Sequence, residues 1–228
     1  DLSMAARSGS DGVAVCPDIN DENVKKALEE MRAAKLPVVL VNHNIPADKP
    51  WPFVGTNNFD FGKKAAQAIL DDLEPGVRVA VVYSEKNPAM YAEKELVEMG
   101  LSGVLGRQML SAVASLKTDT NPQSAEQVIY QLVRTMDEKA TVVFTDAEDT
   151  IAGTQVVVDL NLVGRIRIIG FGNSPEILEY LRKGIISATL VVDPELIGYQ
   201  AIMALVELKE VGYTSNSVDI GIKVIEGE

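Results

Sequence analysis

The sequence predicts an α/β protein whose parallel β-sheets are covered by helices on both faces. Short β-branched apolar runs alternate with amphipathic stretches along the whole chain. Continuous apolar runs such as residues 79–82 suit strands that are buried on both sides, which is typical of parallel pairing with crossover helices. The repeated strand–helix unit therefore predicts doubly wound parallel sheets.

The individual elements follow from these patterns. Strands are expected at residues 12–16, 38–42, 53–56, 78–83, 108–112, 140–145, 165–170, 187–191 and 218–225. Helices are expected at residues 24–35, 61–73, 88–105, 124–138, 151–162, 175–183 and 194–211. Their ends carry ordinary signals: Asp21 or Asn23 can cap the helix at 24–35, and Pro75-Gly76 can stop the helix at 61–73.

The composition is that of an acidic globular protein. A chain of 228 residues can form one large domain or two smaller lobes. The net charge of −12, with no basic stripe, argues against direct binding to nucleic acid or anionic membranes, because phosphates need clustered Lys and Arg. No apolar run approaches the roughly 18 residues of a membrane-spanning helix.

Catalytic and metal motifs are missing from the sequence. It has no Gly-x-Ser-x-Gly elbow, no phosphate-binding loop and no set of His, acid and nucleophile, so we expect a protein that is not an enzyme and needs no cofactor. The acids at 146–149 lack the Gly and the distal Glu of a calcium loop, and His43 has no second ligand nearby, so no metal site is expected. Cys16 lies in the apolar run 12–16 and is expected to be a buried core thiol.

Several segments, taken in order, carry a family resemblance. Residues 11–15, 35–42 and 53–62 resemble the first-lobe strands and first hinge of type I periplasmic binding proteins, and residues 164–171, 184–189 and 193–201 continue the match. Essentially the whole chain is similar to the ribose-binding-protein-like sugar receptors of this superfamily, which also includes the effector domains of LacI-type repressors. The tail at 216–225 looks more like that of transport-type members.

The resemblance implies two doubly wound parallel-sheet lobes joined by a hinge of about three crossings. The first lobe would hold residues 1–56 and 193–219, and the second residues 57–192 and 220–228. By comparison with the family, the first strand, helix and strand are not in this sequence, so we expect an incomplete first lobe.

The resemblance also implies that residues of the first lobe and of the first crossing contact the ligand. Asn42 and His43 follow the strand at 38–42, and Asn57 lies at the first crossing. An amide can both donate and accept hydrogen bonds, so Asn42 suits a ligand rich in hydroxyl or amide groups. His43 is either a ligand contact or a polar residue at a strand end.

From the second lobe we expect contacts from Lys94, Asp146 and Asn173. Lys94 is the nearest substitute for an Arg of the family, or it belongs to a solvated helix face. Asp146 either lines the cleft or is solvated beside a helix that Asp149 or Thr150 caps.

Two further positions lack groups that the family aims at a sugar. Gly172 and Val192 stand where the family has acidic and amide side chains. These losses make the expected pocket too apolar for tight binding of an ordinary free hexose or pentose.

We therefore expect an extracytoplasmic solute-binding protein, periplasmic or lipoprotein-anchored, that captures a small polar, sugar-like ligand between two lobes for an ABC-type transporter. Its partners would be that ligand, a membrane permease or signalling protein, and a second copy of the chain, with no nucleic acid bound directly. One alternative is the ligand-sensing domain of a LacI-type regulator, which would be cytoplasmic, or of a sensor kinase. The other is a degenerate member that binds no small molecule.

Overall fold

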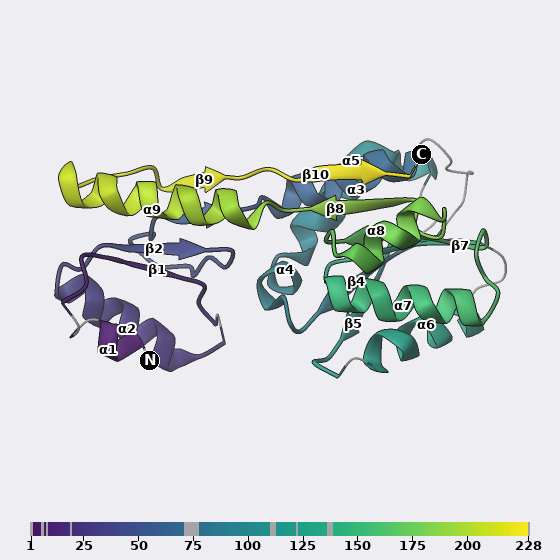
Figure 1. The fold of residues 1–228 in the computed structure, drawn as a ribbon, viewed down its shortest axis with the longest axis horizontal. Helices are drawn as coiled ribbons and strands as arrows, with labels where there is room; N and C mark the ends of the chain where they lie inside the picture. Colours follow the sequence, from purple (N-terminus) through teal and green to yellow (C-terminus); the bar gives the residue numbers. More distant parts are fainter. Residues whose placement is uncertain are drawn as a thin grey trace. The chain divides into compact units, whose positions relative to one another are not determined.

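The computed structural model describes residues 2–5, 7, 9–18, 20–70, 78–109, 113–121, 123–135 and 139–227. It divides into two compact units, each with its own sheet (Figure 1). Unit 1 comprises Asp1–Asn57 and Asp193–Gly221, and unit 2 comprises Asn58–Val192 and Ile222–Glu228. The chain therefore passes from one unit to the other three times. The predicted fold class, α/β with two parallel-sheet lobes, is confirmed.

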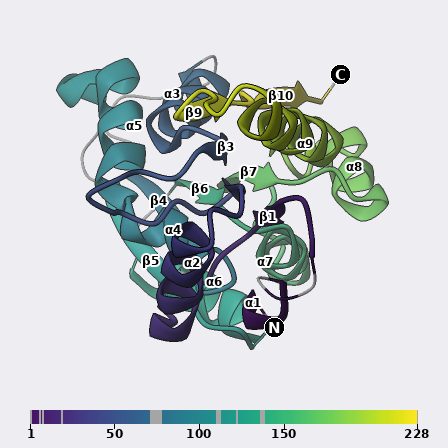
Figure 2. The ribbon, with the colours of Figure 1, turned by 90° about the vertical axis from the view of Figure 1, so that its left-hand side faces the viewer.

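Unit 1 has a four-stranded parallel sheet covered by helices on both faces (Figures 1 and 2). The strand order is β1 (Val13–Val15), β2 (Val38–Val41), β3 (Phe53–Gly55) and β9 (Ser217–Asp219). Helix α2 (Glu22–Ala33), which adjoins α1 (Leu2–Ala5), buries Leu28 and Met31 against Val38 and Leu40. Helix α9 (Pro194–Glu210) contacts β1, β2 and β3. β1 forms one edge of this sheet.

Unit 2 has a six-stranded sheet in the order β10 (Lys223–Glu226), β8 (Ala188–Val191), β7 (Ile166–Phe171), β6 (Ala140–Phe144), β4 (Arg78–Ser84) and β5 (Val113–Thr118). All neighbours are parallel except β10, which is antiparallel to β8. One face carries α3 (Asn58–Leu70), α4 (Pro88–Ala92) and α5 (Lys94–Met109). The other carries α6 (Gln123–Thr135), α7 (Ala147–Asp159) and α8 (Pro175–Arg182).

Helices α3 and α5 approach each other closely because glycines lie at their contact. A Cβ atom on Gly62 would lie 2.0 Å from the carbonyl oxygen of Val97, and one on Gly100 would lie 2.2 Å from that of Phe59. Neither position can hold a side chain without moving the backbone of the other helix. The two helices therefore pack through their main chains here.

Four of the expected elements differ in the structure. The strand expected at 108–112 is wrong: α5 breaks at Gly106 (φ +69°, ψ 157°) and is helical again up to Met109, residues 110–112 lie outside the described part, and the strand is β5. Sequence patterning missed β5 because it is an edge strand whose residues are mostly exposed or half-buried. The single helix expected at 88–105 is two, α4 and α5, separated at Glu93, whose φ of −111° and ψ of 26° are not helical.

The strand expected at 218–225 is also two strands, β9 and β10, which belong to different sheets. Gly221, with φ of +75°, lies between them at the third crossing. Helix α7 begins at Ala147, four residues before the expected start at 151. The expected stop signal at Pro75-Gly76 and the expected helix end at 136–138 lie outside the described residues.

Candidate ligand site

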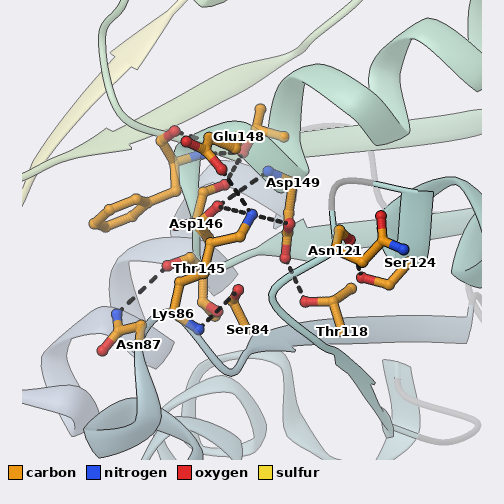
Figure 3. A network of polar contacts seen from close by, with 12 residues as sticks. Ser84, Lys86, Asn87, Thr118, Asn121, Ser124, Thr145, Asp146, Glu148 and Asp149 are labelled. Carbon is orange, nitrogen blue, oxygen red and sulfur yellow. Dashed lines mark hydrogen bonds and ion pairs between the residues drawn. The ribbon is translucent and has the colours of Figure 1, made fainter. Parts of the chain in front are cut away.

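The carboxyl ends of β4, β5 and β6 bring polar residues together at one edge of the unit 2 sheet (Figure 3). Ser84 and Thr118 end β4 and β5, Thr145 follows β6, and all three are buried. In open α/β sheets, ligands bind beyond the carboxyl ends of the strands. This edge is therefore the candidate site of unit 2.

Lys86 is the centre of this polar network. Its Nζ lies 3.0 Å from a carboxylate oxygen of Asp149, 3.0 Å from one of Glu148 and 3.4 Å from one of Asp146. Figure 3 shows the lysine reaching from the loop after β4 to the three acids at the start of α7. One cation thus serves three carboxylates, which leaves a local excess of negative charge.

The three acids differ in their access to solvent. The side chain of Asp149 is 1% exposed, whereas that of Glu148 is 71% exposed. Asp149 also accepts a hydrogen bond from the hydroxyl of Thr118, on β5. Asp149 is therefore a structural carboxylate, Asp146 is intermediate at 20% exposed, and Glu148 is the most exposed of the three.

The surroundings of Lys86 hold its ammonium charged. Burial lowers the pKa of Lys86, but hydrogen bonds to Glu148 and Asp149 and the charges of Asp146 and Asp149 outweigh burial, and the net pKa is raised. An ammonium with three carboxylates around it is stable in its charged form. Lys86 therefore neutralises part of the acidic cluster at any physiological pH.

Asp146 caps helix α7. Its side chain accepts a hydrogen bond of 3.0 Å from the backbone N–H of Asp149, and its backbone is extended, as usual for an N-cap. The expectation that Asp149 or Thr150 caps this helix is therefore wrong. Thr150 instead donates its hydroxyl to the carbonyl of Asp146 at 2.7 Å and accepts the N–H of Phe171 at 3.0 Å, which ties α7 to β7.

The other two site residues predicted in unit 2 lie apart from this network. Lys94 begins α5, and its Nζ lies 5.3 Å from the centre of the Tyr91 ring. Asn173 is exposed after β7. Within the described part of the chain, no hydrogen bond or ion pair joins Lys94, Asp146 and Asn173. Sequence reasoning missed Lys86; its position directly after a buried strand was the available signal.

Gly172 adopts a conformation that a side chain rarely adopts. Its φ is +95°, and a Cβ atom there would lie 3.0 Å from the Cβ of Ala147. Its carbonyl oxygen accepts a hydrogen bond of 2.6 Å from the hydroxyl of Thr189. Where the start of α7 meets the end of β7, the sheet edge therefore carries two small residues, Ala147 and Gly172, and no polar side chain from either.

In unit 1, the loop after β2 forms a tight turn. Asn42 has φ of +59°, and the N–H of His43 donates to the carbonyl of Val41 at 2.6 Å. This hydrogen bond across a residue of positive φ is a strained γ-turn. Asn42 and Asn57 are exposed, and His43 is half-buried.

His43 contacts the end of the neighbouring strand. Its Nδ1 lies 3.0 Å from the carbonyl oxygen of Pro17 and 3.7 Å from the Sγ of Cys16. The contact with Cys16 raises the pKa of His43; burial opposes this, and the Pro17 carbonyl adds to it. Cys16 is exposed, so the expected buried thiol is wrong, because β1 is an edge strand.

Trp51 is not available to stack on a ligand. It is buried in the core of unit 1, and the guanidinium of Arg32 lies 3.7 Å from the centre of its ring. Arg32 also donates to the carbonyl of Lys49 at 2.9 Å.

Comparison with known proteins identifies the family. Residues 2–212 match the periplasmic binding protein domain, so the chain belongs to this family of non-enzymatic solute-binding proteins. The resemblance to type I sugar-binding members is confirmed, as is the prediction that the chain is not an enzyme.

Individual relatives agree with this assignment. The chain is 25% identical over 199 residues to the ribose import binding protein RbsB of Bacillus subtilis (strain 168), covering 87% of this chain and 63% of that protein. Solved structures with a similar fold include GanP, a glucose-galactose binding protein from Geobacillus stearothermophilus, with a TM-score of 0.85 and 24% sequence identity. The similarity covers 99% of this chain and 80% of that one. Another is the Caulobacter myo-inositol binding protein bound to myo-inositol, with a TM-score of 0.84 and 22% sequence identity. The similarity covers 99% of this chain and 77% of that one.

Proposed function

We propose that this chain is the receptor of an extracytoplasmic import system of the ABC type and that it captures a small, polar, sugar-like solute. Family membership supports the solute-binding role. The observation that carries the proposal is the polar carboxyl edge of the unit 2 sheet, where Lys86 and three acids gather. A membrane permease would receive the solute.

The chemistry of this edge suits a ligand with several hydroxyl groups. The exposed Glu148 is a hydrogen-bond acceptor, and the amides of Asn87 and Asn173 can both donate and accept. Hydroxyl groups also do both, so such a solute can pair with each of these side chains. The names of the relatives, which refer to ribose, glucose, galactose and myo-inositol, point to the same chemical class.

Calorimetric titration of the 228-residue chain with ribose, glucose, galactose and myo-inositol tests the proposal, with lysine and spermidine as non-sugar solutes. We expect saturable binding of at least one polyhydroxyl compound. Glu148→Gln should weaken that binding, because an amide has one carbonyl acceptor in place of two carboxylate oxygens. Glu210→Gln, at the exposed end of α9, removes one charge away from the edge and should leave binding unchanged. Binding of the amines alone would contradict the proposal.

The second candidate is a member that binds no small molecule. The small residues Ala147 and Gly172 favour it, because a side chain added at Gly172 would meet Ala147 and neither residue offers a polar side chain to a solute. A folded chain that gives no heat with any solute and no shift in melting temperature at millimolar concentration would favour this candidate.

A further inference from the structure

We propose that the chain forms a homodimer in which helix α9 of one copy packs antiparallel against α9 of the second copy. The inference rests on the side of α9 that faces away from its own sheet, and it does not depend on the proposed solute. None of the residues that carry it belongs to the candidate ligand site in unit 2.

Helix α9, the long helix of unit 1 in Figure 1, is apolar on two sides. One side buries Ile197, Ala201 and Ala204 where the helix contacts β1, β2 and β3. The other side carries large apolar side chains that are between 37% and 60% exposed: Leu196, Tyr199, Ile202, Met203 and Val206. A contiguous exposed patch of this kind marks a protein–protein contact more often than an ordinary soluble surface.

The exposed apolar residues have the spacing of a seam between two helices. Leu196, Tyr199, Met203 and Val206 follow one another at intervals of three, four and three residues. This is the a and d spacing of a heptad, in which the apolar side chains of one helix interlock with those of another. A helix that only covered its own sheet would be polar on this side. The pattern of α9 therefore suits a second helix packed on its outer face.

An antiparallel pair of α9 helices matches this seam with itself. If Leu196 faces the partner's Val206, then Tyr199 faces the partner's Met203, because the two pairs have the same midpoint in the sequence. Both layers are apolar, and a two-fold axis repeats each of them. Such an interface uses the same surface on both copies, which is the usual geometry of a homodimer.

The residues beside the seam favour a second copy and set its direction. Glu195, Ile202 and Lys209 lie on one flank, seven residues apart. In an antiparallel two-fold pair this flank faces the same flank of the partner, so Glu195 meets the partner's Lys209 and the two Ile202 side chains meet at the axis. Opposite charges on the flanks of a helix pair determine its partner and orientation. Lys209 also pairs with Asp11 at 2.6 Å, but both side chains are exposed, so the ammonium can reach a second carboxylate.

Sedimentation velocity over a wide range of loading concentration tests the dimer. The net charge of −12 opposes association, so the measurement is made at about 0.15 M salt, where charges more than about 8 Å apart are screened. We expect a shift from monomer to dimer as concentration rises. Tyr199→Glu should raise the dissociation constant at least about tenfold, because it buries a charge in the apolar seam. Met99→Glu, at an exposed apolar residue of α5, should leave it unchanged, and melting curves check that both variants fold.

Charge reversal tests the antiparallel direction. Glu195→Lys alone and Lys209→Glu alone each place like charges opposite each other, and each should weaken the dimer. An equimolar mixture of these two variants has opposite charges at both contacts, so it should dimerise more strongly than either variant by itself. A loss of folding in one variant cannot produce this recovery.

Three outcomes would overturn the proposal. A chain that stays monomeric at its highest soluble concentration would leave this face of α9 for a different protein. A dimer that Tyr199→Glu does not weaken has its interface elsewhere. A mixture of Glu195→Lys and Lys209→Glu that dimerises no more strongly than its components would exclude the antiparallel contact.

Discussion

Lys86 and Asp149 form an ion pair of 3.0 Å in which the carboxylate is almost completely buried. The two residues are 63 positions apart in the sequence and meet because β4 and β6 are parallel neighbours. A buried charge that loses its partner is strongly destabilising, whereas an exposed pair contributes little. Removing Lys86 would therefore leave the buried carboxylate of Asp149 without its ammonium, at a large cost to the stability of unit 2.

The first prediction concerns this pair. Lys86→Met should lower the free energy of unfolding by about 3 kcal/mol, because it removes the ammonium that compensates the buried carboxylate of Asp149. The loss should be measured by urea denaturation with circular dichroism.

Two further variants serve as controls for it. Lys183→Met breaks the exposed pair with Glu179 and should have little effect. Adding Asp149→Asn to Lys86→Met should recover part of the loss, since the unpaired charge is then gone. Equal losses of unfolding free energy from Lys86→Met and Lys183→Met would show that the buried pair contributes no more to stability than the exposed pair.

The second prediction concerns the contact of α3 with α5. Gly62→Ala should destabilise the chain by about 1–3 kcal/mol, because the new methyl group would lie 2.0 Å from the backbone oxygen of Val97. Gly103→Ala is the matched control: it lies on α5 with nothing within 4 Å of an added Cβ, and it should stabilise by up to about 1 kcal/mol. If Gly62→Ala and Gly103→Ala shift the melting temperature in the same direction, the close packing of α3 on α5 is not the reason for the effect of Gly62→Ala.

The third prediction concerns alkaline pH. Burial raises the pKa of Tyr83, and the charges of Glu98 and Glu95 add to this effect. The unfolded tyrosine, with an ordinary pKa near 10, loses its proton first, so stability from this group is present below about pH 10 and is lost as pH rises further.

Tyr83→Phe tests this prediction. The variant keeps the ring but cannot ionise, so its urea midpoint should fall less between pH 8 and pH 10.5 than that of the native chain. Lys86, whose pKa is also raised, loses its contribution over a similar range in both proteins, so it does not explain a difference between them. If the urea midpoints of the two proteins fall by the same amount between pH 8 and pH 10.5, ionisation of Tyr83 does not contribute to the loss of stability.

The fourth prediction separates two roles of Asp146. Asp146→Ala removes the cap of α7 and should cost about 1 kcal/mol in unfolding free energy. Asp146→Asn keeps a capping oxygen and should be nearly as stable as the native chain. If Asp146 also contacts a solute, as the sequence suggested, Asp146→Asn will weaken solute binding without loss of stability; unchanged affinity would limit Asp146 to its capping role.

The sequence by itself determined the fold class and the family. Strands β4 and β6 are short, β-branched apolar runs whose residues are almost all buried, and such runs between helices predict strands of a parallel sheet. Local signals of this kind depend only on neighbouring residues, so no tertiary information is needed to interpret them.

The tertiary structure decided the partners of the polar side chains and the exposure of edge residues. Lys86 could not be assigned to Asp149 from the sequence, because strand order determines which loops meet. Cys16 lies in an apolar run but is exposed, because β1 is an edge strand. Ion pairing and burial depend on residues that are distant in the chain, and only the folded arrangement of the strands brings those residues together.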